Sequence, residues 1–195
     1  MSTLYTDFIQ NRSGQQILPP RGNVVQMRYN RLDTRGAITF HSRSWEDNGG
    51  RFPMSVTLQN ISSPDNLALI IWNITWESNC GSSQGFVVMR DGNFAPRSVS
   101  SESKGFEAYW DLTFAAGYDG DDSSTPHTHC MTYLGRIGKT GNVEYQLKIQ
   151  NGSDGQCNNF YYNRPVGNSG SDNNEVGVSS VVAFEIGHDG LFLDN

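Results

Sequence analysis

The sequence predicts an all-β protein, an antiparallel β-sandwich or jelly roll that follows a short extended N-terminal arm. The first observation is that helical periodicity is nearly absent, because Gly, Pro or β-branched runs interrupt every stretch of a dozen residues. The second is that short β-branched and aromatic segments recur between clusters of Gly, Asn, Asp, Ser or Pro. Many short strands with turn signals between them are typical of sandwiches and jelly rolls.

Ten segments carry this strand signature. They are Asn23–Asn30, Ala37–Ser42, Met54–Ile61, Leu67–Trp76, Phe86–Arg90, Phe106–Ala116, His129–Arg136, Val143–Gln150, Phe160–Asn163 and Val178–Ile186. Apolar and polar residues alternate over Val143–Gln150 and over Met54–Gln59, which predicts one buried and one solvated face.

One segment, Leu67–Trp72, is apolar on both faces. It is expected to be a central strand or a strand packed against another subunit. Trp72, Trp76 and Trp110 lie within predicted strands and are expected in the core.

Residues 1–20 differ from the rest of the chain, and residues 21–195 are expected to form one β-sandwich head domain. The apolar residues of the first segment flank a turn at Asn11–Gly14 and are Leu4, Phe8, Ile9, Ile17 and Leu18. A hairpin this short does not fold alone, so it is expected to dock on its own domain, on other copies or on another protein. We interpret it as an anchoring arm; the alternative is a frayed terminus.

The composition excludes several classes of function. Charged residues make up 17% of the chain, eleven of its fourteen cations are Arg, and the net charge is −6. Nucleic acid is therefore not expected as a partner, since phosphate binding needs a basic face. No apolar run approaches the ~20 residues of a membrane helix, so no membrane insertion is expected, and no secretory signal pattern is present.

Catalytic motifs are also missing from the sequence. It contains no phosphate loop or dinucleotide fingerprint. Gly167–Ser171 lacks the Gly-x-Ser-x-Gly spacing of a nucleophile elbow. We therefore expect no enzymatic activity and no cofactor.

Two histidines form the most metal-like pattern. His127 and His129 are two residues apart, so on a strand they point the same way. Zinc would need a third ligand, for which Asp119, Asp121 and Asp122 are upstream candidates. The alternative is a polar loop that enters a strand, and we expect no metal.

The three cysteines, Cys80, Cys130 and Cys157, are far apart and form no Cys-x-x-Cys motif. One bridge among them is conceivable, and reduced thiols are the simpler interpretation. Cys130 lies in a predicted strand and is expected to be a small buried hydrophobic residue.

Aromatic residues within polar loops are candidates for surface recognition. Trp45 lies in a loop of Ser, Asp, Asn and Gly, and Tyr161 and Tyr162 follow Cys157–Asn159. Aromatic rings framed by Asn, Asp and Gly suit stacking on sugar rings. Plain loop packing is the alternative, since single exposed aromatics are common.

Four short segments carry a recognisable pattern: Met1–Gly14, Gly22–Gln26 with its Gly-x-Val-Val-Gln pattern, Phe86–Gly92 ending in Arg-Asp-Gly, and Val178–Ile186. They resemble segments of small virion fibre or knob proteins of marine tailed phages, cyanophages in particular. In order, they span nearly the whole chain. The sequence departs from these proteins after the arm, where Ser and Thr give way to arginines, namely Arg28, Arg31, Arg35, Arg43 and Arg51.

The resemblance implies a structural protein of the virion, a homotrimeric β-sandwich head whose arm attaches to other virion proteins. The leading hypothesis is a short tail fibre or knob that contacts the host surface, with a host glycan as a possible further partner. The second hypothesis is a capsid decoration or head-fibre protein, and the third is a carbohydrate-binding module or depolymerase.

Overall fold

The computed structural model describes residues 9–10, 16–17, 23–39, 50–78, 84–95, 114–115, 126–151, 159–167 and 176–187. All regular structure in these residues is β-strand, and every strand pairing is antiparallel. The predicted all-β class is confirmed.

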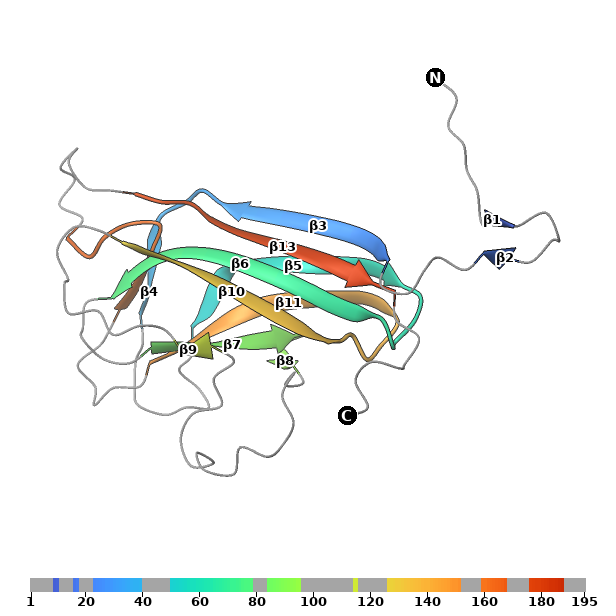
Figure 1. Ribbon diagram of the computed structural model, residues 1–195. Coiled ribbons are helices and arrows are strands. Elements are labelled where there is room, and N and C mark those ends of the chain that lie inside the picture. Colours follow the sequence, from blue (N-terminus) through green and yellow to red (C-terminus); the bar gives the residue numbers. More distant parts are fainter. Residues whose placement is uncertain are drawn as a thin grey trace, which may run out of the picture.

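The strands form a two-stranded sheet, a six-stranded sheet and a five-stranded sheet (Figure 1). Their bounds are β1 Ile9–Gln10, β2 Gln16–Ile17, β3 Val24–Leu32, β4 Gly36–Thr39, β5 Arg51–Ile61, β6 Leu67–Ser78, β7 Gln84–Arg90, β8 Asn93–Phe94, β9 Phe114–Ala115, β10 His127–Arg136, β11 Gly141–Asn151, β12 Asn159–Tyr162 and β13 Ser179–Ile186.

The long strand β6 is the centre of the six-stranded sheet, as its double-sided apolar sequence predicts. Strand β10 pairs along one edge of β6. The other edge is shared, because β13 pairs with Leu67–Asn73 and β12 pairs with Trp76–Ser78. Beyond these strands, β3 pairs with β13 and β4 pairs with β12.

The five-stranded sheet has β11 between β5 and β7. The far edge of β7 is shared in the same manner, by β8 at one end and β9 at the other. The turn into β8 holds Asp91 (φ 49°) and Gly92 (φ 80°), the left-handed pair that a two-residue hairpin of type I′ requires.

The core lies between the two larger sheets and confirms the sandwich. One sheet contributes alternate residues of β6, β10 and β13, and the other contributes alternate residues of β5, β7 and β11. Trp76 is central to it: its ring stacks on Phe160 with the centroids 5.0 Å apart and meets Phe86 edge-on. Trp72 is also fully buried, as predicted, while Trp110 lies outside the described residues.

The predicted strands match the structure within a few residues at most ends. Of Phe106–Ala116 only Phe114–Ala115 is described, and β8 was not predicted. The predicted N-terminal hairpin is confirmed, because Ile9 is opposite Ile17 on either side of the expected turn. Among the described residues, none forms a helix that could cross a membrane.

Candidate interaction surface

The outward-facing side of the six-stranded sheet is apolar across four strands. On β13, Val181 and Ala183 are buried in the core, so Val182, Phe184 and Ile186 project from the opposite face. We call the outward side of β3, β13, β6 and β10 the apolar outer face.

The strand register arranges this face in rows, because directly opposite residues of paired strands share a side of the sheet. One row is Tyr29, Val182, Ile71 and Thr132. The next row is Met27, Phe184, Leu69 and Leu134, and the third is Val24, Ile186, Leu67 and Arg136. Ten of these twelve side chains are aliphatic or aromatic hydrophobic groups, so the face is continuous.

Strand β3 is the most exposed part of this surface. Val24, Val25, Met27 and Tyr29 are each 54–60% exposed, and Leu134 on β10 is 40% exposed. Monomeric proteins seldom expose contiguous apolar patches larger than a few hundred Å². The apolar outer face is therefore the candidate interaction surface of this chain.

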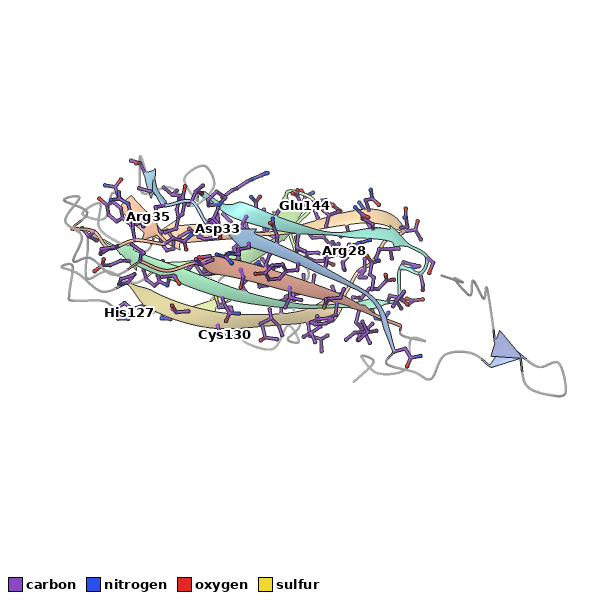
Figure 2. The ribbon with its side chains drawn as sticks, turned by 90° about the horizontal axis from the view of Figure 1, so that it is seen from above. Arg28, Asp33, Arg35, His127, Cys130 and Glu144 are labelled. Carbon is purple, nitrogen blue, oxygen red and sulfur yellow. The ribbon has the colours of Figure 1, made fainter. Side chains whose placement is uncertain are left out.

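Polar residues limit the face at one end. The next row holds Arg31, Ser180, Asn73 and Cys130. Cys130 is exposed, so the prediction that it is buried is wrong. Its neighbours explain the difference, because Met131 points into the core and alternation turns Cys130 outward. Figure 2 shows Cys130 of β10 and Glu144 of β11 on opposite sides of the sandwich.

Hydrogen bonds from the inner side of β3 hold its apolar residues outward. Gln26 Nε2 donates to the carbonyl oxygen of Gln59 at 2.7 Å, and Asn30 Nδ2 donates to that of Ser55 at 2.8 Å. Arg28 Nη2 donates to Gln59 Oε1 at 2.9 Å. Since these polar side chains bind β5, the residues between them face away from it.

A buried carboxylate also helps to hold β3 in place. Glu185 of β13 is 1% exposed, and its two oxygens accept hydrogen bonds of 2.5 Å from Gln26 Nε2 and Asn66 Nδ2. Two amide donors thus replace the water that a carboxylate needs. Through them Glu185 connects β13 to β3 and to the loop before β6.

The histidine pair lies on one side of β10, as predicted, with ring centroids 6.3 Å apart. Trp76 Nε1 donates to His129 Nδ1 at 3.1 Å, so that nitrogen is occupied. Burial, together with the nearby His127, lowers the pKa of His129 below its ordinary value of 6.5. The described residues hold no group of three potential metal ligands, and the aspartates proposed as third ligand lie outside them.

The proposed recognition tyrosines are both half-buried. Tyr162 meets the core residue Phe52 edge-on, with ring centroids 5.8 Å apart. Tyr161 lies under the guanidinium of Arg164, which is 4.5 Å from its ring centre. The ring of Tyr161 is therefore occupied by a cation–π contact on one side. Trp45 lies outside the described residues.

The anchoring residues are described only in part. Ile9 and Ile17 pair across the hairpin, and Leu4, Phe8 and Leu18 lie outside the described residues. The sequence prediction missed the apolar outer face as a whole. Its signal was present in Leu67–Trp72, whose second apolar side is part of this surface.

No protein-family model matches the chain, and no curated protein matches its sequence.

Proposed function

We propose that this chain is a structural protein of a phage virion, a homotrimeric short fibre or knob of the tail. In this proposal residues 1–20 attach it to other virion proteins and the sandwich is the head that contacts the host cell surface. The proposal assigns the chain no catalytic role, no cofactor and no nucleic-acid partner.

The observation that carries the proposal is the N-terminal hairpin. Strands β1 and β2 pair with each other and with neither larger sheet, and Figure 1 shows them outside the sandwich. An isolated two-stranded hairpin is marginally stable in water. A segment of this kind gains stability by docking on a partner, which is what an anchoring arm does.

The sandwich supports the rest of the proposal. Its apolar outer face suits a chain that works in an assembly, where neighbouring copies cover such surfaces. For the host contact, Trp45, Tyr161 and Tyr162 remain candidates, with a surface glycan as the ligand. Since Arg164 covers one side of the Tyr161 ring, a ligand that stacks on this ring would have to use its other side.

The position of the chain on whole particles tests this function. A C-terminal label imaged on intact virions should appear at the tail, in multiples of three copies. Label over the shell would instead support the capsid decoration protein, and absence of label from particles would refute a virion role.

The arm can be tested separately. Deletion of residues 1–18 should abolish incorporation into particles, whereas the purified deletion protein should keep the β-type circular dichroism spectrum of the full chain. Incorporation of the shortened chain at normal copy number would refute the anchoring assignment.

A further inference from the structure

We propose that the apolar outer face is the surface on which copies of this chain pack against one another around a three-fold axis. This inference rests on the proposed homotrimer and adds the contact that builds it. The occupant of the face is therefore a second copy of the same chain.

Charge favours this occupant. The chain carries a net charge of −6, so identical copies repel each other overall. The two central rows, from Tyr29 to Thr132 and from Met27 to Leu134, contain no Asp, Glu, Lys or Arg. Copies can approach through these rows without bringing like charges together, and both sides of the contact gain by excluding water.

The two ends of the face carry charges of both signs. Arg31 pairs with Asp33 beyond the first row, and in the third row the Arg136 guanidinium is 3.8 Å from the Asp65 carboxylate. All four side chains are between 37% and 65% exposed, so they can exchange partners with a neighbouring copy. Around a three-fold axis the same end of each copy lies next to that of its neighbours, and ends with both signs let an Arg of one copy meet an Asp of the next.

The course of the chain agrees with this arrangement. Val24, the first residue of β3, lies in the same row as Ile186 and Leu67, and the N-terminal segment joins the sandwich at that end (Figure 1). Three copies that pack through this face bring their three arms to one end of the assembly. The arms can then attach together to a single partner.

The test uses the full-length chain and its mass in solution by light scattering. The wild-type chain should have three times the mass of the 21.6 kDa monomer. Met27→Glu combined with Leu134→Glu places two carboxylates at exposed positions of the second of the two central rows. Since an unpaired buried charge costs several kcal/mol, the dissociation constant should rise at least ~100-fold and monomer should appear.

Phe94→Glu is the matched control. Phe94 is 56% exposed on β8 of the other sheet, so the same change is made away from the proposed interface. This variant should remain trimeric. Circular dichroism and thermal unfolding should show that all variants are folded, and if the double Glu variant is not, Met27→Gln with Leu134→Gln should weaken association by ~10-fold.

Each of the other possible results refutes the proposed interface, the proposed homotrimer or both. A wild-type trimer that survives both double variants refutes this interface and leaves the proposed function intact. A trimer that Phe94→Glu disrupts assigns the contact to the other sheet. A monomeric wild-type chain refutes both the interface and the homotrimer.

Discussion

The outer sides of two strands, β11 of the five-stranded sheet and β13 of the six-stranded sheet, have opposite chemistry although their inner sides are alike. On the five-stranded sheet, β11 turns Val143, Tyr145, Leu147 and Ile149 into the core and Glu144, Gln146 and Lys148 outward. On the six-stranded sheet, β13 buries Val181 and Ala183 but turns Val182, Phe184 and Ile186 outward.

This difference separates the residues that stabilise the fold from the residues that contact other molecules. Water suffices for the outer side of β11, whereas the outer side of β13 gains free energy when another surface covers it. We therefore expect large stability effects from the shared inner faces, whereas changes on the outer faces should affect association or have little effect.

The largest effect is expected from Trp76→Ala on the inner face of β6. The change removes the stacking on Phe160, the contact with Phe86 and the hydrogen bond to His129. The free energy of unfolding should fall by about 3–5 kcal/mol, as for other buried Trp truncations. Urea denaturation measures it, with Thr140→Ala in the exposed turn before β11 as a control that should cost less than about 0.5 kcal/mol.

The next effect concerns two carboxylates in different environments, buried Glu185 on β13 and exposed Glu144 on β11. In Glu185→Gln, a new amide N–H₂ would meet one of the two amide donors of Gln26 and Asn66. We expect a loss of about 1–3 kcal/mol in the free energy of unfolding. The same change at exposed Glu144 should alter it by less than about 0.5 kcal/mol, and equal effects at the two sites would contradict the hydrogen-bond network.

The inner faces could be predicted from the sequence because alternation alone defines them. Val143–Gln150 and Met54–Gln59 fold as their patterns indicate. Strand β3 reverses its own pattern, since polar Gln26, Arg28 and Asn30 face β5 and apolar Met27 and Tyr29 face outward. Alternation predicts that the two faces of a strand differ. Which face turns inward depends on the groups of the strand packed against it, here the hydrogen-bond acceptors of β5.

The candidate site was less predictable than the fold for the same reason. The apolar outer face joins residues of four strands that are far apart in the chain, and only the pairing register brings them into rows. The burial of Cys130 was predicted wrongly because the sequence does not show which side of the sheet a strand residue faces until one of its neighbours is known to be buried. The hairpin turn at Asp91–Gly92 did carry a local signal, the Asp-Gly pair of type I′ turns.

A smaller effect is expected from pH, through His129. Its pKa is lowered in the folded protein by burial and by His127, so the unfolded chain binds a proton at a higher pH than the folded chain. This contribution to stability is complete above about pH 6.5 and is lost as pH falls from there through the lowered pKa. His129→Gln should flatten the pH dependence of unfolding between pH 7 and 5, and an unchanged slope would refute this assignment.

The smallest effect concerns Tyr145, which lies on the inner face of β11. Its hydroxyl is buried and has no hydrogen-bond partner among the described residues, and burial raises its pKa above the ordinary value. Because removing an unsatisfied buried hydroxyl relieves its desolvation penalty, Tyr145→Phe should leave stability unchanged or raise it by up to about 1 kcal/mol. A loss above about 1 kcal/mol for Tyr145→Phe, measured by urea denaturation at pH 7, would show that the hydroxyl is bonded in solution and that the inner face is more polar than its alternation implies.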